Sequence, residues 1–425
     1  MRKKELNKVI AMNKRIIIHA AELATCAGKG PKHGKEMADA GIIKDGAVVI
    51  EGDKIVFVGT TEEVLDKYGD MSGYEVFDAS GKAVIPGLVD SHTHFIFGGY
   101  RADEFSWRLK GDSYMSIMER GGGIASTMNA TRAASAEEMF ETGKERLDRM
   151  LSYGITTVEG KSGYGMDCDT ELRMLEVMKD LNEKHPVDIV STYLGPHAIP
   201  PEYKGKDREF IDYCVKEVMP KVKEAGLAEF ADIFTEKGVF GIEDSRHYFA
   251  GARDLGFKLK VHADEIVDLG GAAMAVEEGC QSADHLLMAS DESIEKLAKG
   301  NTVATLLPAT AFSLGAPYAK GRQMIDSGCA VAIASDYNPG SCHTCSIPLI
   351  IAISCIYMHL SIEEVLNALT INGAAAVDRA DEIGSIEVGK KADLVILDKP
   401  SIHFLPYCTA MNIVEHVVKN GEIVL

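Results

Sequence analysis

A chain of 425 residues with 46% hydrophobic and 26% charged residues is long enough for one large domain and a smaller one. Its 64 acidic against 45 basic side chains give a net charge of -19, which disfavours nucleic acid and anionic membranes as partners. No run approaches the about 18 apolar residues of a membrane span, and nine scattered cysteines are typical of a reducing compartment. We therefore expect a cytoplasmic protein.

The two flanks of the chain have similar sequence patterns. Residues 14–80 carry strand and turn signals, and similar patterns return at 392–398 and 416–424. Neither flank alone is long enough for an all-β domain. We expect residues 1–82 and 381–425 to combine into one small, discontinuous β-sandwich domain.

The central region, residues 83–380, alternates short apolar runs with amphipathic stretches, which is typical of repeated βα units around a parallel sheet. Eight strands are expected, at residues 83–90, 155–160, 187–194, 230–235, 257–262, 281–285, 302–307 and 330–335. Helical patterns separate them at residues 137–152, 170–184, 206–224, 243–255, 268–279 and 319–327. Eight such strands predict an α/β fold, a (β/α)8 TIM-like barrel, whose working residues lie at the C-terminal strand ends.

His92 and His94 lie at the end of the first of these strands. Alternate strand residues point to the same face, so two imidazoles at this spacing can bind one cation. His262 ends the fifth strand and Asp336 follows the eighth. Imidazole and carboxylate groups suit a hard or borderline metal, so these four residues predict a site for one divalent or trivalent ion, zinc or iron.

Other reactive residues lie at the same strand ends. His285 ends the sixth strand, and Glu265 lies three residues beyond His262, close to the mouth of that strand without being forced onto the metal. Cys342 and Cys345 form a single C-x-x-C just beyond Asp336. Because no second such pair is present, we expect unlinked thiols. Since the segment lies just after Asp336, it could shape the pocket wall.

Longer motifs resemble those of the metal-dependent amidohydrolase superfamily and, within it, the imidazolonepropionase family. The segments that carry this resemblance are Pro86-Gly87-Leu88-Val89-Asp90 with its two following histidines, Phe95 to Arg101, Gly121-Gly122-Gly123-Ile124, Lys161-Ser162-Gly163-Tyr164-Gly165, His262-Ala263-Asp264-Glu265 and Ser335 to Ser341. The resemblance covers roughly residues 80 to 420. It departs at Pro196 and at the Cys342 to Cys345 segment, both near the expected pocket.

The resemblance implies hydrolysis of 4-imidazolone-5-propanoate to N-formimidoyl-L-glutamate by hydroxide generated on the metal. Asp336 or Glu265 would move the proton, and His285 would steady the developing oxyanion. Arg101 supplies the guanidinium that a carboxylate tail needs. The other implied substrate-binding residues are Tyr164, His197, Glu265, Asn338, Gly340 and Ser341. The expected partner is this small molecule, in a homodimeric protein.

Several alternatives remain open at this point. Arg101 could pair with the nearby acids Asp103 or Glu104, and Tyr164 and His197 could be structural. Lys161 and Lys237 follow two strands and could bridge a second metal if modified, but we expect solvated lysines and one metal. The same ligand set would also serve a cytosine or guanine deaminase, whose neutral substrate would not need Arg101. A non-catalytic assembly protein is a remote alternative.

Overall fold

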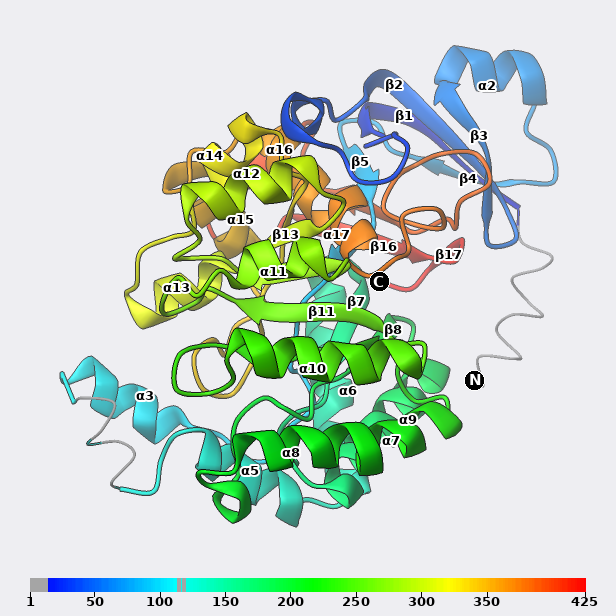
Figure 1. The fold of residues 1–425 in the computed structure, drawn as a ribbon. Helices are drawn as coiled ribbons and strands as arrows, with labels where there is room; N and C mark the ends of the chain where they lie inside the picture. The colour runs from blue at the N-terminus through cyan, green and yellow to red at the C-terminus, as the bar shows by residue number, and fades with distance from the viewer. Residues whose placement is uncertain (1–13, 113–115, 117–119) are drawn as a thin grey trace.

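The computed structural model describes residues 14–112, 116 and 120–425, and its larger sheet is a parallel barrel (Figure 1). Backbone hydrogen bonds from Asp336 to His92 and from His94 to Tyr337 join its last and first strands. The expected (β/α)8 barrel is therefore confirmed. In order, the barrel strands are β6 (Leu88–Asp90), β7 (Ile155–Lys161), β8 (Asp188–Tyr193), β9 (Phe230–Ala231) with β10 (Phe234–Thr235), β11 (Lys258–Ala263), β12 (Ser282–His285), β13 (Val303–Leu306) and β14 (Val331–Ile333).

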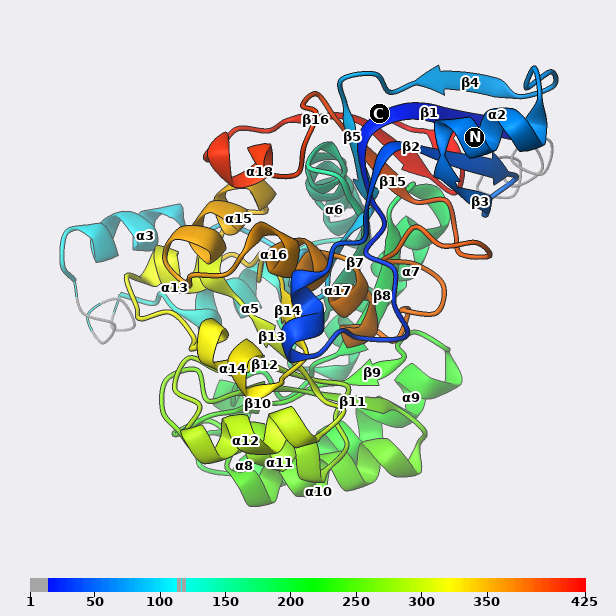
Figure 2. The same ribbon diagram turned by 90° about the horizontal axis from the view of Figure 1, so that it is seen from above.

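Amphipathic helices surround this barrel (Figures 1 and 2). The helix α6 shows how the sequence specifies them: Ser135 and Glu138 form a capping box at its start, and Met139, Leu147 and Met150 face the core. The helices that follow the strands are α3 (Ala102–Leu109), α5 (Ile124–Ala133), α6 (Ala136–Ser152), α7 (Cys168–Lys184), α8 (Asp207–Tyr213), α9 (Met219–Glu224), α10 (Ile242–Asp254), α11 (Gly271–Glu277), α12 (Asp291–Lys299), α13 (Pro308–Leu314), α14 (Gly321–Ser327), α15 (Ile347–Ile356), α16 (Ile362–Leu369) and α17 (Ile371–Ala376).

The two chain ends meet in a second sheet, which confirms a β-rich domain built from both termini. Figure 2 shows its blue N-terminal and red C-terminal strands side by side. Buried side chains of both ends, including Ile17, Val48 and Leu394, form its own core. Its elements are β1 (Lys14–Ala24), β2 (Ile42–Glu51), β3 (Lys54–Thr60), β4 (Glu75–Asp78), β5 (Ala83–Pro86), β15 (Leu394–Leu397), β16 (Val414–Lys419) and β17 (Glu422–Ile423), with α2 (Thr61–Tyr68) and α18 (Phe404–Tyr407) outside the sheet.

The strand expected at residues 83–90 is divided between the two sheets. Its first half, β5, pairs with β1 and β15 of the terminal sheet, whereas its second half, β6, pairs with β7 of the barrel. Gly87 separates them, and a Cβ there would lie 2.3 Å from Oγ1 of Thr156. The run is uniformly apolar because both halves are buried, so its pattern could not reveal the change of sheet.

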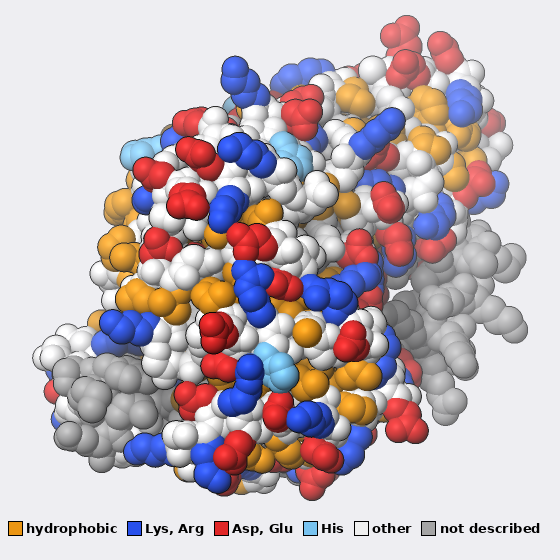
Figure 3. Space-filling view, in the orientation of Figure 1, with side chains coloured by type: hydrophobic (Ala, Val, Ile, Leu, Met, Phe, Trp, Pro, Cys, Tyr) orange, Lys and Arg blue, Asp and Glu red, His pale blue; other side chains and the backbone are white. Residues whose placement is uncertain are grey.

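The surface agrees with the composition. Acidic and basic side chains are intermixed over the face drawn in Figure 3. Within the described residues, every helix is too short or too polar to span a bilayer. All nine cysteines are free, as expected.

Candidate active site

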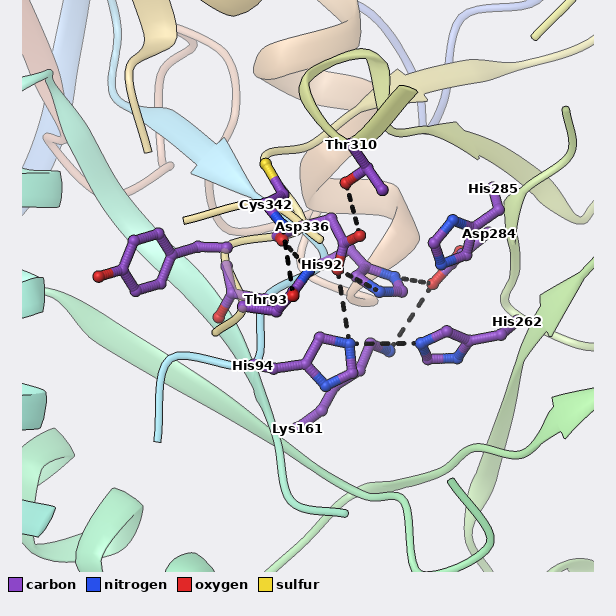
Figure 4. Close-up of polar contacts among 12 residues, drawn as sticks. His92, Thr93, His94, Lys161, His262, Asp284, His285, Thr310, Asp336 and Cys342 are labelled. Carbon is purple, nitrogen blue, oxygen red and sulfur yellow. Dashed lines mark hydrogen bonds and ion pairs between the residues drawn. The ribbon is translucent and has the colours of Figure 1, made fainter. Parts of the chain in front are cut away.

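Four side chains predicted to bind a metal converge at the carboxyl end of the barrel strands (Figure 4). His92 and His94 follow β6, His262 lies in β11, and Asp336 follows β14. Asp336 Oδ1 lies 3.6 Å from Nε2 of both His92 and His94, and His94 Nε2 lies 3.3 Å from His262 Nε2. All four side chains are buried.

Buried carboxylates orient these rings from behind. Asp284 Oδ2 lies 2.6 Å from Nδ1 of His92, so the opposite nitrogen of that ring is directed toward Asp336. Asp232 Oδ2 lies 3.0 Å from His262 Nδ1. A carboxylate behind a ligating imidazole fixes its orientation and its tautomer.

The donor set fits a divalent metal. Burial, followed by the nearby positive charges, lowers the pKa values of His92 and His94 well below the usual range, so both rings are neutral, as metal ligands must be. His92 Nε2 is buried and lacks a hydrogen-bond partner among the described residues. Three imidazole nitrogens and one carboxylate oxygen make a set typical of zinc or iron.

A fully buried cluster of charged side chains lies beneath the ligands. Lys161 Nζ bonds Glu159 and Asp232 at 2.8 and 2.7 Å, and Lys260 Nζ bonds Glu159 at 2.8 Å. With Asp284 also present, two lysines face three carboxylates. The cluster therefore carries a formal charge of 2 − 3 = −1, which favours a cation above it.

The expectation that Lys161 is solvated is wrong, whereas Lys237 is exposed as expected. Lys161 ends β7, and its side chain points into the closed barrel, where water is excluded. The neighbouring carboxylates outweigh the effect of burial and raise its pKa above the usual range. A charged ammonium already bonded to two carboxylates is not available as a modified bridging ligand.

Two carboxyl groups in the site can hold a proton, Glu265 and the predicted ligand Asp336. Glu265 follows β11, and its Oε1 lies 3.7 Å from His285 Nδ1. Burial, then the nearby Asp336, raises the pKa of Glu265 to about 8, and burial raises that of Asp336 to about 7. Thr310 donates a hydrogen bond to Asp336 Oδ2 at 2.6 Å.

His285 is held in an unusual backbone conformation at the end of β12. Its φ is +79°, and Asp336 also has a positive φ of +51°. Left-handed conformations of non-glycine residues concentrate at functional sites. Burial lowers the pKa of His285 well below the usual range, so its ring is neutral. His285 also lies within ligand range of a cation shared with His92 and Asp336.

A pocket of about 410 Å³ opens above the cluster. It brings together every predicted site residue except His92, which lies beneath its floor. The predicted residues that line it are His94, Arg101, Tyr164, His197, His262, Glu265, His285, Asp336, Asn338, Gly340 and Ser341. His197 stacks on His94, with ring centroids 4.9 Å apart.

Arg101 also lines this pocket and directly precedes α3. Its Nε and Nη2 atoms both lie 2.8 Å from Glu104 Oε2, and that oxygen also accepts the backbone N–H of Gly123 at 3.0 Å. Arg101 therefore pairs with an acid, as the alternative expected, and lines the pocket as well. Gly340 leaves room for it, because a Cβ there would lie 2.1 Å from Arg101 Nη1.

Asn338 shapes the turn that carries Gly340. Its side-chain oxygen accepts the backbone N–H groups of Gly340 and Ser341 at 2.9 and 2.8 Å, and its amide donates to the carbonyl of Asp336 at 2.8 Å. Cys342, directly beyond, is buried and donates to the carbonyl of Ser335. Neither cysteine lines the main pocket: Cys342 lies behind its wall residues, and Cys345 lines a separate pocket of about 220 Å³.

Sequence reasoning missed several residues of the site. The unpredicted lining residues are Glu104, Arg108, Asp112, Ile124, Phe234, Ile266 and Leu314. A signal existed for Asp284, which directly precedes His285 in a strand whose other residues, Ser282 and Ala283, are small. Glu104 was expected only as a possible ion-pair partner of Arg101, and Arg108 could have been found only if a helix had been expected at 102–109.

Known proteins resemble this chain over almost its whole length. The model of the amidohydrolase family matches residues 83–424. An imidazolonepropionase of Parabacteroides distasonis is 57% identical over 97% of this chain and 99% of its own, and one of Clostridium tetani is 54% identical over 96% and 97%. A triazine hydrolase variant shares the fold, with a TM-score of 0.73 at 17% identity over 97% of this chain and 94% of its own. The chain thus belongs to the amidohydrolase family and, within it, to the imidazolonepropionases.

Proposed function

We propose that this chain hydrolyses 4-imidazolone-5-propanoate to N-formimidoyl-L-glutamate, a step of histidine degradation. The observation that carries the proposal is the polarity of the pocket. Residues able to bind a metal, carboxyl groups able to hold a proton and the guanidinium of Arg101 line one pocket. A substrate with a cyclic amide and a carboxylate tail matches both kinds of group, whereas a nucleobase has no carboxylate for Arg101.

We propose that His92, His94, His262 and Asp336 hold one zinc or iron ion. When bound, such an ion supplies Lewis-acid activation of water at neutral pH. The convergence of four buried ligand atoms supports this assignment. The bonding of Lys161 to two carboxylates supports a single ion.

The proposed proton transfers use three residues. Asp336, as a carboxylate, accepts the proton of the attacking water while the new bond to the ring carbonyl carbon forms. Neutral His285 donates a hydrogen bond to the developing oxyanion. Glu265, protonated because its pKa is raised to about 8, supplies a proton to the ring nitrogen as the carbon–nitrogen bond breaks.

The remaining lining residues position the substrate. Arg101 pairs with the propanoate, and Tyr164 and His197 offer hydrogen bonds to the ring beside His94. The turn formed by Asn338, Gly340 and Ser341 closes the other side. We further propose a cytoplasmic homodimer, for which the support is the acidic, mixed-charge surface, the free cysteines and the size of the barrel.

The test is an assay of the purified protein with imidazolonepropanoate, with metal analysis of the same sample. We expect turnover and one zinc or iron per chain. His262→Ala should lose both metal and turnover while its circular dichroism stays that of a folded barrel. A preference for cytosine or guanine, or full activity in metal-free His262→Ala, would overturn the assignment.

A further inference from the structure

The end of the pocket formed around Arg101, where the carboxylate tail is expected, has an unusual charge balance for an anionic ligand. Arg101 is the expected partner of the carboxylate, but two of its three nitrogens already face Glu104. Asp112, also in the lining, pairs with Arg120 at 3.0 Å. Each of these pairs is formally neutral, so neither supplies the net positive charge that a desolvated carboxylate requires.

Arg108 lines the same end of the pocket. It lies seven residues after Arg101, so the two side chains share one face of α3, the helix that projects from the barrel body in Figures 1 and 2. Burial, and then the charge of Arg101, lower the pKa of Arg108, which places the two guanidinium groups within electrostatic reach of each other.

One nitrogen of Arg108 is buried without a partner. Its Nη2 is shielded from solvent and makes no hydrogen bond to any residue that the structure describes, and the side chain forms no ion pair with them. Its other contact is with the Phe105 ring, whose centroid lies 5.1 Å from the guanidinium carbon. An unsatisfied buried guanidinium donor costs free energy that a bound acceptor would recover.

We propose that Arg108 is a second guanidinium for the carboxylate tail and selects carboxylate-bearing substrates over neutral ones. With Glu104, Arg101 and Arg108 together, this end of the pocket has a formal charge of 2 − 1 = +1. Glu104 holds Arg101 in place, and Arg108 supplies the uncompensated charge. This inference rests on the proposed function, because it assumes that the tail of the substrate lies at this end.

The experiment compares two substrates in four proteins. The substrates are imidazolonepropanoate and its propanamide counterpart, which has the same shape without the charge. The proteins are the parent, Arg108→Met, Arg108→Lys and the control Lys110→Met, which removes an exposed positive charge two residues further on. Circular dichroism and metal content, measured on each, verify that the variants are folded and loaded.

We expect Arg108→Met to raise KM for the propanoate about 10- to 100-fold, the range for losing one charged hydrogen-bond partner, with kcat within about twofold. KM for the propanamide should stay unchanged, and Arg108→Lys should recover part of the loss. A structural role would instead lower turnover of both substrates equally.

The outcomes separate the two proposals. If the parent does not hydrolyse imidazolonepropanoate, the proposed function fails. The role of Arg108 is overturned if the parent is active and Arg108→Met has the same KM for the propanoate as Lys110→Met. It is also overturned if Arg108→Met loses activity equally toward the propanoate and the propanamide. In both cases the proposed function stands.

Discussion

At the scale of single residues, Glu265 offers the most direct test of the proton path. Its pKa is raised to about 8 by burial and by Asp336, so the protonated form is present at neutral pH and is lost as the pH rises through that value. If that proton reaches the leaving nitrogen, kcat/KM should fall above about pH 8. Glu265→Gln should lower the rate about 100- to 10,000-fold and remove this alkaline decline.

A pH profile of kcat/KM with the parent, Glu265→Gln and the exposed control Glu243→Gln tests this expectation. The control should reproduce the parental profile. A parental rate that stays level from about pH 7 to 9, or a decline that persists in Glu265→Gln, would assign the proton to another group.

A site residue can be predicted from the sequence when its position in a local pattern, such as the end of a strand, indicates its role. His262 and Asp336 each end an apolar strand, which is where a barrel exposes its reactive groups. By contrast, Lys161 donates a hydrogen bond to Asp232, which lies 71 positions away in the chain. Only the closed barrel brings these two residues together. Lys161 was expected in solvent for the same reason. A lysine is rarely buried unless it is paired with an acid, and the sequence does not show which acid that would be.

At the scale of elements, the segment after β14 is shaped by a glycine that touches a side chain of another element. Gly340→Ala would place a Cβ 2.1 Å from Arg101 Nη1 in the present arrangement, so the guanidinium must move. Because the end of an arginine is flexible, the fold should survive. We expect KM for imidazolonepropanoate to rise about 10- to 100-fold, since a displacement of about 1 Å is costly in a binding site.

Gly241→Ala is the matched control, because nothing lies within 4 Å of a Cβ at that position. Steady-state kinetics and thermal unfolding of both variants distinguish displacement of Arg101 from general destabilisation. If Gly340→Ala binds substrate as well as Gly241→Ala does, the proposed place of Arg101 in the site is wrong.

Elements were predictable where length and periodicity agree. The strand at 155–160 and the helix at 137–152 are both found within two residues of their observed ends, because a long amphipathic helix has a capping box and a buried strand has β-branched residues. The helix α3 was not expected, because its eight residues are too few for the helical repeat of apolar residues to be recognised. Arg108 was missed for that reason, whereas Glu104 was expected only as a possible ion-pair partner of Arg101.

At the scale of the whole molecule, the terminal sheet and the barrel are joined by a buried charge. Lys419, in β16, bonds Asp393 beside β15 at 2.5 Å and Asp188 of the barrel strand β8 at 2.9 Å. The side chain of Lys419 is 1% exposed and that of Asp393 is 2% exposed. The ion pairs therefore tie the chain's C-terminal segment to the barrel strand β8.

Lys419→Met should weaken this connection, because it leaves Asp393 as a buried carboxylate without its counter-charge. Removing one partner of a buried ion pair destabilises by about 3 to 5 kcal/mol. Urea unfolding followed by circular dichroism should show a lower midpoint than Lys299→Met, which removes a 78%-exposed lysine and should change little. At low denaturant, kcat/KM and metal content should match the parent in both variants, because Lys419 lies outside the pocket. Equal midpoints for the two variants would mean that packing of the terminal sheet against the barrel, and not this ion pair, holds the two parts of the molecule together.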